Sequence, residues 1–169
     1  CVVGSWITGK FGPDIMTLHF YLGYAVLGLL AFRVVWGFVG PEHARFASFA
    51  YGPGAVARYV RGMFARAPSY WRGHNPLGAV FVFILLGVLA VQATMGLFAD
   101  PEDYLNVGPL AGLVGIDNAR TALGWHHTLA PVILLLVGLH VAAIVFYKRW
   151  KHEDLIRPMV TGEKTVRRA

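Results

Sequence analysis

The chain has 169 residues, of which 56% are hydrophobic and only 14% charged, with a formal net charge of +6 and a single cysteine. An ordinary soluble domain carries about 25% charged residues, so this composition excludes that class and indicates a membrane protein. The lone Cys1 excludes an internal disulfide framework. We predict an all-α integral membrane protein that forms one domain over residues 1–169.

Four apolar segments, taken in chain order, predict transmembrane helices. The first, residues 1–9, is short and begins without Met, so we expect the second half of an N-terminally truncated helix. Segments 15–38, 76–99 and 122–147 are each long enough to span a bilayer. The sequence therefore predicts a four-helix transmembrane bundle whose first helix is only partly present.

The segments between these helices are polar. We expect a turn over residues 10–13 with Asp14 as the N-cap of the second helix, which Gly40 and Pro41 then end. Residues 54–67 form a basic amphipathic stretch, expected to lie on the membrane surface. An acidic loop follows at 100–120, and a polar tail at 148–169.

Topology follows from the distribution of Lys and Arg. The connection between the second and third helices and the tail are rich in cations, whereas the other two connections hold only Lys10 and Arg120. The cations of the rich segments are Arg45, Arg58, Arg61, Arg66, Arg72, Lys148, Arg149, Lys151, Arg157, Lys164, Arg167 and Arg168. We therefore expect a multi-pass membrane protein with a cytoplasmic C-terminus, and no binding of nucleic acid.

Two histidines, His126 and His140, lie fourteen residues apart in one apolar stretch. On an α-helix this spacing leaves the second side chain only about 40° from the first and about 21 Å further along the axis. That distance is most of a hydrocarbon core roughly 30 Å thick, where ionisable residues are costly and mark function. One helix would thus present two imidazoles near opposite sides of the membrane, as two stacked haems require.

His19 and His126 each lie about one turn into a helix that starts on the outer side, so we expect them at similar depth. Two neutral imidazoles from facing helices can bind one haem iron axially, which favours electron transfer over oxygen chemistry. Gly23, one turn after His19, would let a flat macrocycle approach the backbone.

His140 would ligate an inner haem, and we expect its partner histidine on the truncated part of the first helix. Arg33 lies fourteen residues after His19, at the depth of His140, and a buried arginine there suits a haem propionate.

Each assignment has a plainer alternative. His19 could bond a neighbouring helix, and His127, about 100° around the helix from His126, could be the ligand in its place. Arg33 could extend to the inner headgroups, and His74 is better explained as a turn residue.

Eight segments carry a family resemblance, and together they cover nearly the whole chain in order. They are HFYLGY at 19–24, FRVVWGFVGPEHARFASF at 32–49, GHNPLGA at 73–79, TMGLFAD at 94–100, GPLAGLV at 108–114, WHH at 125–127, GLHVAA at 138–143 and LIRPMVTGEK at 155–164. The sequence resembles the bacterial cytochrome b561 family, which is similar to the cytochrome b subunits of nickel–iron hydrogenases.

The resemblance implies two b-type haems in a four-helix bundle, with one histidine ligand early in the first helix, one early in the second and two on the fourth. Matched residue by residue, it gives His19, His126 and His140 as iron ligands, and the first-helix histidine has no counterpart here. It also implies electron transfer between the quinone pool, ubiquinone or menaquinone, and periplasmic carriers such as a cytochrome c or a hydrogenase.

We therefore expect a di-haem b-type cytochrome of the bacterial inner membrane, an electron-transfer subunit in preference to a stand-alone oxidoreductase. The acidic segment 100–117 is either a docking surface for a basic periplasmic partner or a solvated loop. A superoxide oxidase or quinone-reducing enzyme at the outer haem is the alternative. A histidine-based metal transporter is disfavoured, because the helices hold no Asp, Glu or Cys beyond Cys1, and a plain membrane anchor needs no histidine pair.

Overall fold

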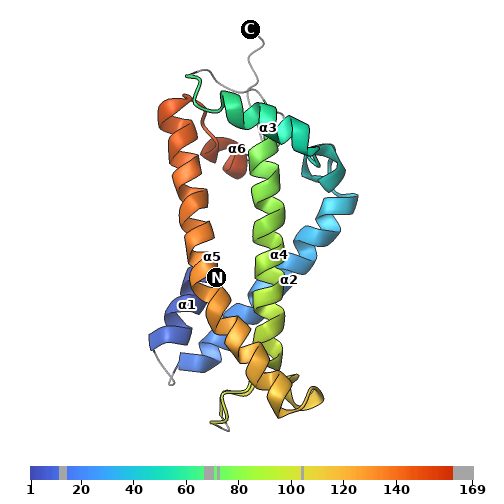
Figure 1. Cartoon of the computed structure of the whole chain (residues 1–169), viewed down its shortest axis with the longest axis vertical. Coiled ribbons are helices and arrows are strands. Elements are labelled where there is room, and N and C mark those ends of the chain that lie inside the picture. The colour runs from blue at the N-terminus through green and yellow to red at the C-terminus, as the bar shows by residue number, and fades with distance from the viewer. Residues whose placement is uncertain (12–14, 67–70, 72, 104, 162–169) are drawn as a thin grey trace. The chain divides into compact units, whose positions relative to one another are not determined.

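The computed structural model describes residues 1–11, 15–66, 71, 73–103 and 105–161, and within these residues it contains helices and no strand (Figure 1). The helices are α1 (Val2–Phe11), α2 (Met16–Val39), α3 (Pro53–Gly62), α4 (Pro76–Phe98), α5 (Ile116–Trp150) and α6 (Ile156–Thr161), with the short 3-10 helices η2 (Glu42–Ala44), η3 (Phe46–Ser48) and η4 (Ala111–Leu113). Helices α2, α4 and α5 are long and apolar enough to cross a membrane. The prediction of an all-α membrane protein is confirmed.

The helix boundaries differ from those expected most clearly at the end of α1 and the start of α5. Helix α1 continues through Lys10 to Phe11, and α5 starts at Ile116, six residues before the predicted position. The sequence predicts a loop over the charged first turns of α5, but a helix need not be apolar where it leaves the membrane. The carboxylate of Asp117 also suits the positive end of the helix dipole. The predicted turn through Pro13 and the Asp14 N-cap lie outside the described residues.

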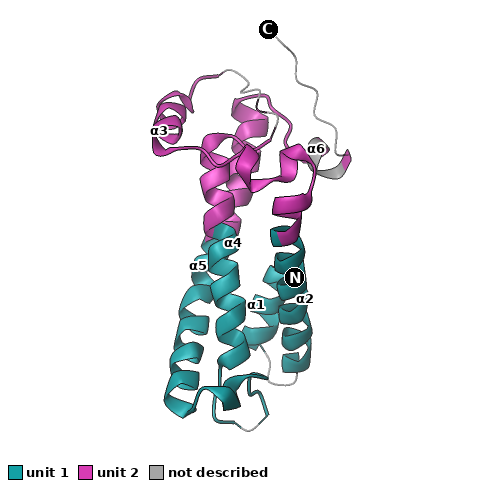
Figure 2. Cartoon of the chain, turned by 90° about the vertical axis from the view of Figure 1, so that its right-hand side faces the viewer, with its two compact units in different colours: residues 1–34, 85–135 teal, residues 35–84, 136–169 magenta. Residues whose placement is uncertain are grey.

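The chain divides into two compact units (Figure 2). Unit 1 comprises residues 1–34 and 85–135, and unit 2 comprises residues 35–84 and 136–169. Each is described by itself below. The single membrane domain expected over 1–169 stays a prediction.

Unit 1 contains α1, most of α2, the second part of α4 and the first part of α5. Its buried side chains are largely small, which lets helix backbones approach one another in an apolar environment; they include Ala99, Ala111, Ala119, Ala122 and Ile133.

After α4 the chain folds back onto the end of that helix. The Gly108 amide donates to the Ala99 carbonyl at 2.7 Å, and the Leu110 amide donates to the Leu97 carbonyl at 2.9 Å. A Cβ atom on Gly108 would lie 2.5 Å from the Leu97 carbonyl oxygen, so this position accepts only glycine. Two of the carbonyls that a helix end leaves unpaired are thereby satisfied by the chain itself.

Unit 2 is built around aromatic side chains that follow the end of α2. Phe46, Phe49 and Phe83 pack with ring centroids 5.5 to 5.9 Å apart, and the Phe49 side chain is 1% exposed. The His74 ring lies 4.8 Å from that of Phe49, and its backbone carbonyl accepts from the Tyr51 hydroxyl. His74 therefore belongs to this aromatic cluster.

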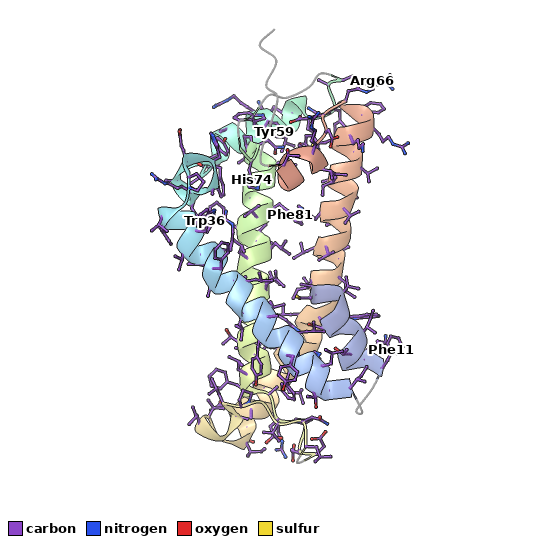
Figure 3. The ribbon with its side chains drawn as sticks, turned by 180° about the vertical axis from the view of Figure 1, so that it is seen from behind. Phe11, Trp36, Tyr59, Arg66, His74 and Phe81 are labelled. Carbon is purple, nitrogen blue, oxygen red and sulfur yellow. The ribbon has the colours of Figure 1, made fainter. Side chains whose placement is uncertain are left out.

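Residues 54–62 of the amphipathic stretch predicted over 54–67 lie in α3, the helix that carries Tyr59 (Figure 3). The Tyr59 hydroxyl bonds the Tyr147 hydroxyl, which also accepts from the Asn75 amide at 3.1 Å. Beyond the helix, the Trp150 indole donates to the Phe64 carbonyl at 3.0 Å. Tyr59 of α3 and the segment after this helix are thereby linked to the last turns of α5.

Candidate functional site

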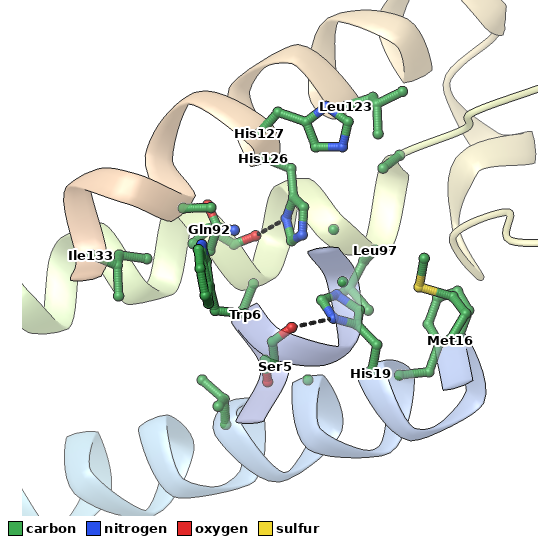
Figure 4. Close-up of a pocket in the computed structure, with 18 of the residues that line it drawn as sticks. Ser5, Trp6, Met16, His19, Gln92, Leu97, Leu123, His126, His127 and Ile133 are labelled. Carbon is green, nitrogen blue, oxygen red and sulfur yellow. Dashed lines mark hydrogen bonds between the residues drawn. The ribbon is translucent and has the colours of Figure 1, made fainter. Parts of the chain in front are cut away.

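A cavity of about 600 Å³ lies within unit 1, between α1, α2, α4 and α5. Its walls are mainly apolar, with leucine the commonest residue, and His19 and His126 enter it from α2 and α5 (Figure 4). Ligand and cofactor cavities are typically apolar with a few convergent polar groups. The structure thus brings together two of the predicted iron ligands.

His19 is fixed by the backbone of α1. Its Nδ1 lies 2.8 Å from the Ser5 carbonyl oxygen and 3.4 Å from the hydroxyl of the buried Thr8. A carbonyl oxygen can only accept, so Nδ1 carries the proton and donates. The lone pair of the neutral ring is then on Nε2, the atom available to a metal.

His126 is fixed in the same way by the backbone of α4. Its Nδ1 lies 2.9 Å from the Gln92 carbonyl oxygen and donates to it. Its lone pair is therefore also on Nε2. Hydrogen bonding of one ring nitrogen to a carbonyl is the usual support of a metal-bound histidine, because it sets the tautomer and the ring orientation.

The two imidazoles lie side by side in the cavity, with ring centroids 5.9 Å apart and planes at 79°. Two imidazole nitrogens that each lie roughly 2 Å from a shared metal ion place their ring centroids roughly 6 Å apart. The separation of the His19 and His126 rings is thus compatible with both imidazoles binding one metal ion.

Each imidazole packs against a glycine of the helix that it bonds. A Cβ atom on Gly9 would lie 3.0 Å from both Nδ1 and Cε1 of His19. A Cβ atom on Gly96 would lie 2.8 Å from Cε1 and 3.0 Å from Nδ1 of His126. These glycines leave the space that the rings occupy.

The cavity suits a haem in further respects. Gly23 lines it, and an added Cβ there would have no atom within 4 Å; its role in the approach of a haem stays a prediction. Among the described residues of the lining, Lys10 supplies a cation and Asp103 a carboxylate. Hydrogen bonds from the Asn106 backbone and side chain lower the Asp103 pKa, so this group is ionised at neutral pH. Lys10, in the last turn of α1, suits a propionate.

His127 also reaches the lining of this cavity. Its ring centroid lies 6.5 Å from that of His126, and its side chain is exposed. Within the described part of the chain it forms no hydrogen bond that would fix its tautomer. The geometry therefore favours His126 as the ligand.

His140 and Arg33 lie in different compact units, His140 in unit 2 and Arg33 in unit 1. The His140 ring stacks on Phe81, with centroids 5.7 Å apart and planes at 13°. The pairing of Arg33 with a haem at His140 stays a prediction.

The sequence analysis did not identify the residues that hold the imidazoles. The acceptors at Ser5 and Gln92 are backbone carbonyls, which carry no side-chain signal. Gly9 and Gly96 each follow an acceptor by four residues, but this spacing predicts a histidine contact only when the histidine that faces the helix is already known. Lys10 was expected in a turn.

An all-helical membrane protein with paired histidines in an apolar cavity is the class that this fold and site define. The profile described as prokaryotic cytochrome b561 matches residues 2–162. The chain therefore belongs to the prokaryotic cytochrome b561 family, whose members are membrane proteins that bind haem b and transfer electrons.

Individual relatives agree with this assignment. A probable Ni/Fe-hydrogenase B-type cytochrome subunit of Rhizobium leguminosarum bv. viciae is 26% identical over 164 residues, which cover 87% of this chain and 67% of the relative. One of Azotobacter vinelandii is 30% identical over 162 residues, covering 85% of this chain and 65% of the relative. The chain thus spans about two thirds of the length of these relatives. No solved structure matches it significantly.

Proposed function

We propose that the chain is the haem-bearing electron-transfer subunit of a redox complex in the bacterial inner membrane, with a cytoplasmic C-terminus. The observation that carries the proposal is the pair of imidazoles whose Nδ1 atoms are both bound to helix carbonyls. Such a pair leaves the Nε2 lone pair of each ring available to a metal, and the two ring centroids lie 5.9 Å apart. When bound, the haem supplies a one-electron couple without an open coordination position.

His19 and His126 would hold the outer haem in this proposal, and Gly23 would leave room for it beside α2. His140 would be a ligand of a second, inner haem, and Arg33 would pair with a propionate of that haem. The protein's part is to fix the ligands, exclude water with its apolar walls and thereby set the potential of each haem.

The partner is proposed from the names of the relatives, which are cytochrome subunits of Ni/Fe-hydrogenases. A hydrogenase or another periplasmic carrier such as a cytochrome c would exchange electrons at the outer haem, and quinone would exchange with the membrane pool. The acidic segment 100–117 would receive a basic partner surface, because charge complementarity speeds encounter.

The test is haem content by pyridine haemochrome together with a reduced-minus-oxidised spectrum. We expect a b-type signal that loses one haem in His126→Ala, because axial ligation of that haem is broken. The matched variant His127→Ala should keep the full content. Normal haem content in a correctly inserted His126→Ala protein would contradict the ligand assignment.

Oxidation of superoxide at the outer haem is the second candidate function. Lys10 lines the cavity, and a cation beside the haem would attract an anionic substrate. We expect Lys10→Glu to slow superoxide-dependent haem reduction while reduction by a neutral donor is unchanged. Equal rates with superoxide before and after the substitution would remove this candidate.

A further inference from the structure

Unit 1 holds its two histidines by the same local arrangement, repeated on two helices. In each case a histidine donates from Nδ1 to a carbonyl of a neighbouring helix, and its ring covers the glycine four residues after that carbonyl. The pairs of acceptor and glycine are Ser5 with Gly9 on α1, and Gln92 with Gly96 on α4.

Helix geometry explains why a glycine stands at this position. A carbonyl in an α-helix points along the axis toward the amide four residues later, with which it forms the helical hydrogen bond. A donor from another helix that reaches this oxygen from the side must pass over the residue that carries the amide. At Gly9 and Gly96 the flat ring lies where the side chain of that residue would otherwise stand.

We propose that Gly9 and Gly96 are positioning residues for the axial histidines, acting through the Nδ1 bonds that they permit. This inference rests on the proposed haem-ligand role of His19 and His126. An alanine at Gly96 would place its Cβ 2.8 Å from the His126 ring, closer than nonbonded atoms allow. The ring would have to move away from α4, and the bond to the Gln92 carbonyl would be broken or lengthened.

The consequence is electronic as well as geometric. A carbonyl that accepts from Nδ1–H makes the imidazole a stronger donor to the metal through Nε2. Stronger donation stabilises the oxidised iron more than the reduced iron and lowers the midpoint potential. Loss of the bond should therefore raise the potential of this haem. It should also weaken haem retention roughly 10- to 100-fold, the usual effect of removing such outer support.

The experiment compares Gly96→Ala with Gly87→Ala. Both glycines lie on α4 within unit 1, but a Cβ on Gly87 would have no atom within 4 Å. We expect Gly96→Ala to raise the midpoint potential of one haem and to change its ferric EPR signal, which depends on the angle between the imidazole planes. Gly87→Ala should leave both unchanged. Identical potentials and EPR signals in the two variants would overturn the proposal.

A second measurement does not depend on haem loading. In haem-free protein with ¹⁵N-labelled histidine, the chemical shifts report which ring nitrogen of His126 is protonated. We expect protonated Nδ1 in the wild type and a mixture of tautomers in Gly96→Ala. A Gly96→Ala spectrum that still shows only protonated Nδ1 would count against the proposal.

Gly9→Ala tests the same role independently at His19. Gly28→Ala of α2 is its control, since a Cβ on Gly28 would have no atom within 4 Å. The Gly9 position is less crowded, because its added Cβ would lie 3.0 Å from the His19 ring. Gly9→Ala therefore tests the positioning role if Gly96→Ala does not fold. A wild-type protein without haem would refute the proposed function itself. A haem-loaded wild type whose potential is unaffected in both glycine variants would refute only the positioning role.

Discussion

The two compact units hold their membrane histidines in different ways. In unit 1, His19 and His126 each have a fixed tautomer, because a backbone carbonyl accepts from Nδ1. In unit 2, His140 is covered by the parallel ring of Phe81 and, among the residues that the structure describes, bonds no carbonyl. The chain thus holds the His19 and His126 rings by hydrogen bonds to backbone carbonyls, whereas it positions the His140 ring by stacking. The difference shows that a histidine's spacing on a helix does not determine how tightly its ring is held.

The largest expected effect comes from removing the ligand of unit 2. His140→Ala should remove the inner haem and leave the outer one, because the outer ligands are held within unit 1 alone. Haem content and a redox titration check this, and one transition should disappear while the other keeps its potential. Loss of both transitions from an inserted protein would show that the outer site depends on His140.

A smaller effect is expected at Arg33, the predicted propionate partner. Hydrogen bonds to charged groups contribute about 1.5–3 kcal/mol, so Arg33→Leu should weaken binding of the inner haem roughly tenfold to a hundredfold and lower its potential. Arg33→Lys should retain part of both. A titration of haem binding and potential that is identical in wild type and Arg33→Leu would contradict the propionate role.

The sequence predicted the spans and the histidine pair because both depend on side-chain pattern. Apolar length located α2, α4 and α5, and ionisable residues within apolar runs identified His19 and His126. The start of α5 at Ile116 was not predicted, because the length of an apolar segment gives no sign of a helix that continues into water. The supporting carbonyls of Ser5 and Gln92 were missed for another reason: every residue has a carbonyl, and only the packing of helices selects one.

The hydrogen bonds of the Tyr147 hydroxyl in unit 2 can be tested for their contribution to stability without altering a histidine. The Tyr147 side chain is buried, and its hydroxyl bonds both Tyr59 and Asn75. Tyr147→Phe would leave these two partners without the shared hydroxyl, which costs about 1–3 kcal/mol for a buried polar group. Thermal unfolding in detergent should show the loss, whereas Tyr21→Phe, at a side chain that is 66% exposed, should not. Equal unfolding temperatures would show that the cluster does not stabilise unit 2.

The smallest effect is expected in the loop that follows α4 in unit 1. A hydrogen bond from Arg120 lowers the Glu102 pKa, and Glu102 adopts a left-handed backbone with φ of 60°. Because the pKa is lower in the folded chain, the ion pair stabilises the loop above about pH 4.3, the ordinary glutamate value. This contribution is lost as the pH falls further.

Hydrogen exchange of residues 100–120, corrected for the intrinsic rate, measures this effect. We expect protection to fall at acidic pH in the wild type. In Glu102→Gln, protection should already be low at neutral pH and change less on acidification. A wild type and a variant with the same pH profile would show that other contacts hold the loop.

Because the chain folds back onto the end of α4, this helix should tolerate bilayers of different thickness. A transmembrane helix normally ends where water can solvate its last carbonyls, and moving that end into lipid exposes unpaired oxygens. Here the Gly108 and Leu110 amides already bond the carbonyls of Ala99 and Leu97. This end of α4 therefore needs less interfacial water, so hydrophobic mismatch can be absorbed by a shift of the lipid boundary without unwinding the helix.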